Sequence, residues 1–150
     1  MGISQFGDGN GLRSHRFRRS IGACFRQRFV SPVAYRAFLE NGKWPESTIF
    51  VLEIRRSASH GSINRQGHFQ TGLVEIEAEV KDSARFPDKW AFFALGEDRP
   101  SAEPLATRTC ITCHSKNGAV DNTFVQFYPT LLEVAKKKGT LSPSFSAASN

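Results

Sequence analysis

The chain has 150 residues, of which 39% are hydrophobic, and this length suits one domain with a single core and one enclosed site. No apolar run approaches the ~18 residues that a membrane-spanning helix needs, so we expect no membrane span. The net charge of +6 is concentrated in residues 1–30, which hold six arginines against Asp8 alone. Because these arginines lack the interleaved aromatic residues and motifs of nucleic-acid-binding proteins, we expect no nucleic acid partner.

The basic N-terminal segment differs in composition from the rest of the chain. It is rich in Gly, Arg and Ser over residues 1–24, which predicts a poorly ordered lead-in. The apolar stretch that follows these arginines is too short for the hydrophobic region of an export signal. We therefore assign residues 1–28 to a truncated or misassigned lead-in, 29–140 to the folded domain and 141–150 to a flexible tail.

The predicted elements follow in chain order. Ser31–Gly42 is expected to form a short helix, because serine can cap it, proline suits its first turn and glycine ends it. A β-rich run over Thr48–Ile54 predicts a strand, and residues 57–67 have the composition of a turn. The same patterns predict strands over His68–Val80 and Trp90–Leu95, and a helical segment over Phe124–Lys138 that is interrupted near Pro129.

Acidic residues alternate along the second predicted strand. Side chains two residues apart in a strand point to the same face, so Glu75, Glu77 and Glu79 share one face. On composition alone, this face is typical of the solvated side of an antiparallel sheet.

The stretch Cys110-Ile-Thr-Cys113-His114 places two thiols and an imidazole within five residues. This is the attachment pattern of c-type haem, in which the thiols bind the two vinyl groups and the adjacent imidazole coordinates iron. A zinc site needs four ligands, and only Cys24 and three other histidines remain; a thioredoxin-like pair needs a βαβ context. A plain disulfide is left open by the spacing. We predict covalently attached haem c, with His114 as the iron ligand.

The second axial position of the iron decides the class of cytochrome. An electron carrier usually fills it with methionine or histidine, but the single methionine is Met1. His15 falls in the lead-in and His60 in a predicted turn, which is typical of surface histidines, whereas His68 begins a strand and is the candidate sixth ligand. We expect an open position on the iron, where a small molecule binds.

Three segments together resemble a known family. "CITCHSKNGAVDNTFVQFYPTLL", "GHFQTGLVEIEAEVKDSARFPDKWAFF" and "FVSPVAYRAFLENGKWPESTIFVLE" are similar to the cytochrome P-460 family and the related β-sheet cytochromes c′, from about Phe29 to Leu132. The resemblance implies a mainly β (α+β) fold, with an antiparallel sheet, a few short helices and one c-type haem. It also implies a homodimer in the periplasm, where a lost export signal explains the N-terminus.

The resemblance also assigns site residues. P-460 members oxidise hydroxylamine with a haem cross-linked to a lysine and with a distal glutamate that accepts protons. Glu77 matches that glutamate, and because Glu75 and Glu79 share its face, one of them could substitute for it. Leu52 stands where the family has the cross-linking lysine and cannot form the bond. Lys81 matches an ordinary lysine of the family and is expected in a surface ion pair. Arg26 has no assigned role and is expected to be exposed.

Three functions follow from these expectations. The first is a cytochrome whose open iron site, walled by Phe50 and Leu52, binds nitric oxide or a similar nitrogen-oxide ligand. The second is a hydroxylamine-oxidising enzyme in which Glu77 is the proton acceptor, weakened by Leu52 at the lysine position. The third is a simple electron-transfer cytochrome, with His68 as a second ligand and another cytochrome as redox partner.

Overall fold

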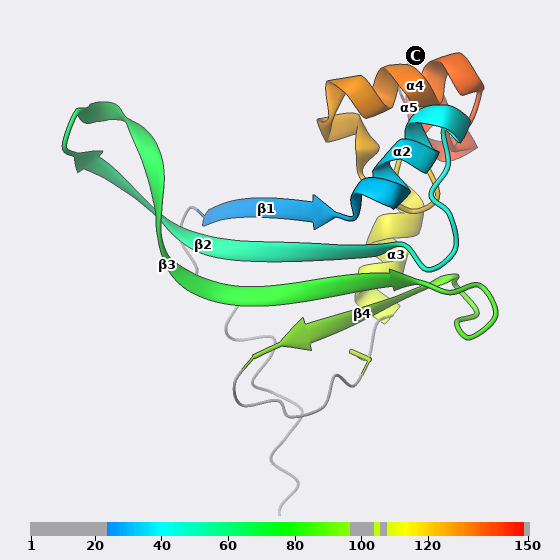
Figure 1. Cartoon of the computed structure of the whole chain (residues 1–150), viewed down its shortest axis with the longest axis horizontal. Coiled ribbons are helices and arrows are strands. Elements are labelled where there is room, and N and C mark those ends of the chain that lie inside the picture. Colours follow the sequence, from blue (N-terminus) through cyan, green and yellow to red (C-terminus); the bar gives the residue numbers. More distant parts are fainter. Residues whose placement is uncertain (1–23, 97–103, 106–107, 149–150) are drawn as a thin grey trace, which may run out of the picture. The chain divides into compact units, whose positions relative to one another are not determined.

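The computed structural model describes residues 24–96, 104–105 and 108–148, which form a four-stranded antiparallel sheet and several short helices (Figure 1). The strands are β1 (Cys24–Val30), β2 (Ile49–Gly61), β3 (Asn64–Lys81) and β4 (Trp90–Leu95), in the sheet order β1-β2-β3-β4. The helices are α2 (Pro32–Asn41), α3 (Arg108–Asn117), α4 (Pro129–Lys138) and α5 (Pro143–Ala148), with a 3-10 helix, η1 (Val125–Phe127). The predicted mainly β (α+β) class is confirmed. None of the helices that the structure describes is long and apolar enough to cross a membrane.

The described residues divide into two compact units. The first contains residues 24–26 and residues 54–74, which form the far part of the β2–β3 hairpin. The second contains residues 27–53 and the described residues from 75 onward. The Cys-x-x-Cys-His motif belongs to the second unit.

Helix α2 forms as its sequence predicts. The Ser31 hydroxyl oxygen accepts a hydrogen bond of 3.2 Å from the backbone N–H of Ala34, and Pro32 occupies the first turn. The helix ends at Gly42, which has a φ of 70° and donates its N–H to the carbonyl of Phe38 at 2.7 Å. Glycine adopts this left-handed conformation without the steric penalty of a side chain, so it ends the helix at low cost.

The turn predicted over residues 57–67 lies in the right place but is much shorter than predicted. Strands β2 and β3 continue through it, and the turn is confined to residues 62–63. The left-handed φ values of His60 (62°) and Ser62 (50°) lie at this turn, and an added Cβ on Gly61 would come within 2.4 Å of the Phe69 ring. The segment reads as a loop because Ser, Gly and Asn have low strand propensity, but cross-strand pairing overrides that local preference.

Regular elements also occupy parts of the predicted lead-in and tail. β1 begins at Cys24, and α5 spans Pro143–Ala148. Ser142 precedes α5, and its hydroxyl donates to the Gly118 carbonyl at 2.8 Å while its N–H donates to the Ala119 carbonyl at 2.7 Å. Partners distant in the sequence hold both segments, since β1 pairs with β2 in the sheet and α5 packs against α3.

A series of packed aromatic rings forms the core of the second unit. Phe38 of α2 contacts Trp44 at 4.3 Å between ring centroids, Trp44 contacts Phe50 of β2 at 4.8 Å, and Phe50 contacts Trp90 of β4 at 5.7 Å. All four side chains are buried. Aromatic pairs in this range of distances add about 0.5–1.5 kcal/mol each beyond the burial of their area. The series therefore fixes α2 against the sheet, and α2 in turn packs against α4 (Figure 1).

Candidate functional site

The Cys-x-x-Cys-His motif lies on α3. Residues three and four apart share one face of a helix, so Cys113 and His114 both lie one turn after Cys110. Cys110 is half-buried, Cys113 is exposed, and both are in the thiol form, so no disulfide joins these two residues of the described helix. Both thiols therefore keep the chemistry that a thioether linkage requires.

The imidazole of His114 is held in one orientation. Its Nδ1 lies 2.9 Å from the carbonyl oxygen of Asn122. A carbonyl oxygen only accepts hydrogen bonds, so Nδ1 carries the proton and donates it, and Nε2 keeps its lone pair. A histidine that coordinates a metal through Nε2 is held in this way, by a partner on its other ring nitrogen. His114 is thus prepared as a ligand through Nε2.

Gly118 allows the chain to return to His114 after α3. Its N–H donates to the His114 carbonyl at 2.8 Å. A Cβ at this position would lie 2.7 Å from the backbone carbon of Asn122 and 2.7 Å from the His114 oxygen. Backbone atoms cannot move aside as the end of a flexible side chain can, so only glycine fits here.

We therefore expect Gly118→Ala to lower the free energy of unfolding by about 1–3 kcal/mol, the usual cost of overpacking. Urea unfolding followed by circular dichroism would measure the change. Gly96→Ala is the control, because nothing lies within 4 Å of an added Cβ there. Equal stability of the two variants would contradict this account of the turn.

A buried carboxyl group faces the ligand nitrogen. Oε1 of Glu79, on β3, lies 3.4 Å from Nε2 of His114, and Oε2 lies 3.2 Å from a guanidinium nitrogen of Arg28, on β1. The antiparallel register places Glu79 opposite Phe92 of β4, and the Phe92 ring contacts the imidazole at 4.8 Å between centroids. Phe124 covers the imidazole as well, at 4.5 Å. The neighbouring strands β3 and β4 thus supply Glu79 and Phe92, and the segment after α3 supplies Asn122 and Phe124.

Burial shifts the pKa values of Glu79 and His114 and so sets their protonation states. Loss of hydration raises the pKa of Glu79 to about 7; the positive charge of Arg28 lowers it, and the negative charge of Glu77 raises it further. Burial also lowers the pKa of His114, against the hydrogen bond to Asn122. The contact between Glu79 and His114 is therefore a contact of a carboxyl group with a neutral imidazole near pH 7, and not a full ion pair.

The structure places Glu77 one step further along the same face of β3. Its register partner is Ala94, whereas the partner of Glu79 is Phe92. Glu77 is half-buried and acts on the site through its charge, which contributes to the raised pKa of Glu79. The contact with His114 belongs to Glu79, so the role predicted for Glu77 stays a prediction.

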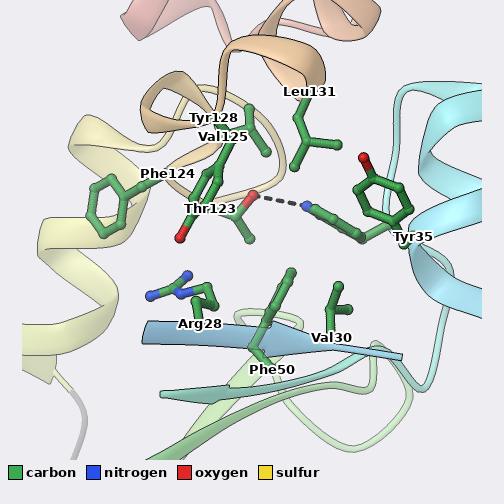
Figure 2. Close-up of a pocket in the computed structure, with 10 residues that line it drawn as sticks. Arg28, Val30, Tyr35, Phe50, Thr123, Phe124, Val125, Tyr128 and Leu131 are labelled. Atoms are coloured by element: carbon green, nitrogen blue, oxygen red, sulfur yellow. Dashed lines mark hydrogen bonds between the residues drawn. The ribbon is translucent and has the colours of Figure 1, made fainter. Parts of the chain in front are cut away.

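A cavity of about 190 Å³ borders this site (Figure 2). Its wall includes Arg28, which contacts Glu79, and Phe124, which contacts His114. Figure 2 shows Arg28 beside Phe124 at one end of the cavity and Tyr35 and Leu131 at the other. The remaining wall is mostly apolar and is formed by Val30, Trp44, Phe50, Thr123, Val125 and Tyr128.

The two apolar residues predicted to wall the site have different positions. Phe50 is 4% exposed and lines the cavity, where the Arg28 guanidinium lies 5.4 Å from the centroid of its ring. Leu52 is half-buried and lies two residues further along β2, outside the cavity wall. The predicted place of Leu52 beside the iron stays a prediction.

Other residues considered from the sequence lie elsewhere. Lys81 was expected in a surface ion pair, but it is 7% exposed and pairs with Asp121, because the Lys81 end of β3 lies against the turn after α3. Nδ1 of the exposed His68 lies 3.1 Å from the Ser57 hydroxyl, within the hairpin unit. Arg26 is exposed, as predicted. Across residues 24–96, 104–105 and 108–148, no three His, Cys, Asp or Glu side chains are grouped so as to hold a metal ion.

Arg28 is the site residue that the sequence analysis missed. Arg28 fell in the predicted lead-in, because Cys24–Val30 mixes apolar and polar residues on both faces and has no alternation that would predict a strand. Glu79 was recognised as sharing a face with Glu77, but the alternation cannot choose between them. Only the register with β4 shows which glutamate meets Phe92 and His114.

Comparison with protein families gives one assignment. The family model described as Cytochrome P460 matches residues 12–125, whereas a search of curated proteins finds no match. The matched range contains β1 with Arg28, β3 with Glu79, and the complete Cys-x-x-Cys-His motif. It covers more than half of the chain and all the residues that surround His114. The chain therefore belongs to the cytochrome P460 family, a family of haem cytochromes.

Proposed function

We propose that this chain is a mono-haem c-type cytochrome that binds nitric oxide or a similar small nitrogen-oxide ligand. In this proposal Cys110 and Cys113 tether the haem and His114 coordinates its iron. The observation that carries the proposal is the state of His114, whose Nδ1–H donates to the Asn122 carbonyl while Nε2 keeps its lone pair and lies 3.4 Å from Oε1 of the buried Glu79. Because haem c is attached outside the cytoplasm, the proposal also places the mature protein in the periplasm.

The described residues fit a c-type haem in their donor chemistry. Two thiols lie one helical turn apart, and the ligand histidine follows the second directly. The imidazole is neutral, because burial lowers its pKa, and the unprotonated nitrogen is Nε2. When bound, the haem would supply a redox-active metal centre at which a small ligand coordinates.

The residues around His114 control access to it. Phe92 and Phe124 cover the imidazole and keep water from competing for its hydrogen bonds. The neighbouring cavity has a mostly apolar wall, which favours a small, weakly polar molecule such as nitric oxide over an ion. Arg28 places one guanidinium group at the edge of this wall, where it can donate a hydrogen bond to a ligand oxygen.

Leu52 supports ligand binding over enzymatic oxidation. It occupies the position at which the resemblance expects the cross-linking lysine, and an aliphatic side chain cannot form that bond. Without the cross-link, the haem keeps ordinary c-type properties. The homodimer and the redox partner suggested by the resemblance stay predictions.

The proposal is tested by mixing the reduced, haem-loaded protein with nitric oxide in a stopped-flow spectrometer. We expect a rapid shift of the haem absorption that saturates at one nitric oxide per haem. A reduced protein that is already six-coordinate and low-spin, and that does not respond to nitric oxide, would contradict it. If His68→Ala then restored the response, the electron-transfer function with His68 as sixth ligand would replace the proposed one.

Hydroxylamine oxidation is the second candidate, and the Glu79–Arg28 pair favours it. A purely apolar pocket would suffice for nitric oxide, whereas here a carboxyl group lies 3.4 Å from the ligand nitrogen and is only 7% exposed. Its oxygens can accept hydrogen bonds from the N–H and O–H groups of hydroxylamine and hold the substrate in one orientation. Glu77, the residue predicted from the resemblance, offers the same chemistry from the next position on that face.

The comparison of Glu79→Gln with Glu77→Gln tests this candidate. Loss of a charge-assisted hydrogen bond to the substrate costs about 1.5–3 kcal/mol, so hydroxylamine-dependent reduction of an acceptor should fall about 10- to 100-fold in Glu79→Gln. Glu77→Gln is the matched control and should change the rate much less. The reverse order would assign the role to Glu77, and equal wild-type rates in both variants would remove the carboxylates from the reaction.

A further inference from the structure

We propose that Lys81 is a positioning residue for His114. Its ion pair with Asp121 holds the turn whose Asn122 carbonyl accepts the Nδ1–H of the imidazole. Lys81 does not contact the imidazole; its effect passes through Asp121 and the backbone of that turn. The consequence for the metal rests on the proposed function of His114 as an iron ligand, whereas the consequence for the imidazole does not.

Lys81 is fixed by contacts on every part of the residue. Its backbone N–H donates to the Thr48 carbonyl at 2.9 Å, and its own carbonyl accepts from Ser47 at 3.1 Å. The ammonium group donates to the Trp44 carbonyl at 2.7 Å and to the carboxylate of Asp121, and it lies 5.9 Å from the centroid of the Trp90 ring. The residue is 7% exposed. The buried ammonium group therefore holds the Trp44 carbonyl and the Asp121 carboxylate in place.

The turn that Lys81 holds has an unfavourable backbone conformation. Asp121 has a φ of 49° and Asn122 a φ of 60°, so two consecutive residues with side chains are left-handed. Asn and Asp tolerate this region better than other residues, but such a pair persists only where its surroundings hold it. The turn closes with a hydrogen bond of 2.8 Å from the Thr123 N–H to the Val120 carbonyl.

Trp44 links the two sides of this arrangement. Its carbonyl accepts from Lys81, and its indole N–H donates to the Thr123 hydroxyl at 2.9 Å. The Asp121-Asn122-Thr123 segment is therefore held at both ends, by Lys81 through Asp121 and by Trp44 through Thr123. Removal of the ammonium group releases the Asp121 end and lets the left-handed residues relax.

The Asn122 carbonyl is the point at which this network meets the imidazole. A strong hydrogen bond on Nδ1 makes Nε2 a better electron donor to a metal, and second-shell partners of this kind tune metal sites. If the carbonyl moves away, Nε2 becomes a weaker donor and the imidazole can also carry its proton on the other nitrogen. Lys81 would thus set the donor strength of His114 from the far side of the turn.

The test compares Lys81→Met and Asp121→Asn with wild type in the haem-loaded, full-length protein. We expect the iron–histidine stretching band in resonance Raman spectra to move to lower frequency and the haem midpoint potential to rise in both variants. The double variant should show no more than the larger single effect, because both changes release the same contact. In the full-length chain before haem attachment, the ¹⁵N shifts of His114 should change from one tautomer to a mixture of two.

Two control variants separate a positioning role of Lys81 from a general effect on the stability of the protein. Ile54→Ala removes a buried side chain of the hairpin unit, and Lys136→Met removes the cation of an exposed ion pair with Glu133. Both should leave the stretching band, the potential and the ¹⁵N shifts at wild-type values, even where the melting temperature falls. If Lys81→Met lowers the melting temperature but leaves all three signals unchanged, Lys81 is structural only and the inference is overturned.

Failure of this inference can be told apart from failure of the proposed function. A wild-type chain that takes up no haem in a maturation-competent host would overturn the proposed function, and the ¹⁵N shifts would still test the role of Lys81. A wild-type chain that binds haem, with unchanged signals in Lys81→Met, would overturn only the role of Lys81.

Discussion

Replacement of both Cys110 and Cys113 by serine is expected to abolish covalent haem attachment. A serine hydroxyl does not add to a vinyl group as a thiol does, so neither tether can form. Haem staining of the protein after a denaturing gel measures the attachment directly, because haem held only by His114 is lost on unfolding. We expect a stained band for wild type and none for the double variant.

Cys24→Ser is the matched control for this experiment. Cys24 is also a half-buried thiol, but it lies on β1 and has no histidine directly after it. Its replacement should leave the stained band as strong as in wild type. A stained band that survives the double replacement, or one that disappears in Cys24→Ser, would show that the haem is not held by the motif on α3.

The second large effect concerns the buried ion pair. Asp121→Ala removes the carboxylate that pairs with Lys81, which is 7% exposed. The other carboxylate near the ammonium group, that of Glu46, lies 3.9 Å away and is 58% exposed, so water screens it and it replaces Asp121 only in part. Loss of one member of a buried pair typically lowers the free energy of unfolding by about 3–5 kcal/mol. Urea unfolding should show a lower midpoint with an unchanged slope, since the surface exposed on unfolding stays the same.

The exposed pair on α4 is the natural control for Asp121→Ala. Lys136 and Glu133 lie 2.8 Å apart, but both side chains are at least half exposed. Water screens such a pair, so Glu133→Ala should change the stability by less than about 0.5 kcal/mol. Equal effects of the two replacements would mean that the Lys81 ammonium group finds water or another acceptor when Asp121 is removed.

Local signals predicted the elements that depend on neighbouring residues. The helix α2 has its capping serine, its first-turn proline and its terminal glycine within the segment itself. The strand β4 begins and ends where its apolar run begins and ends. The helical segment near the C-terminus breaks around Pro129, where η1 gives way to α4, because proline cannot continue a helix through its missing N–H.

Features that depend on residues far away in the sequence were not predicted, or were predicted only in part. The turn composition of residues 57–67 conceals the ends of β2 and β3, because these residues gain strand geometry only from pairing with each other. Arg28 lies in a strand whose order depends on β2, so composition alone placed it in a lead-in. Lys81 was expected at the surface, since nothing in its neighbourhood along the chain indicates the aspartate that covers it.

The sequence by itself determined the chemistry of the motif, because two cysteines and a histidine at this spacing need only one helical turn to act together. Tertiary structure decided which carboxyl group contacts that histidine and which cation pairs with the carboxyl group. Alternation along β3 places Glu77 and Glu79 on one face, but the choice of Glu79 depends on the register with β4, and its partner Arg28 comes from β1, more than fifty residues earlier in the chain. The physical reason is that periodicity acts within a segment, whereas register and burial are set by the packing of segments that are far apart in the sequence.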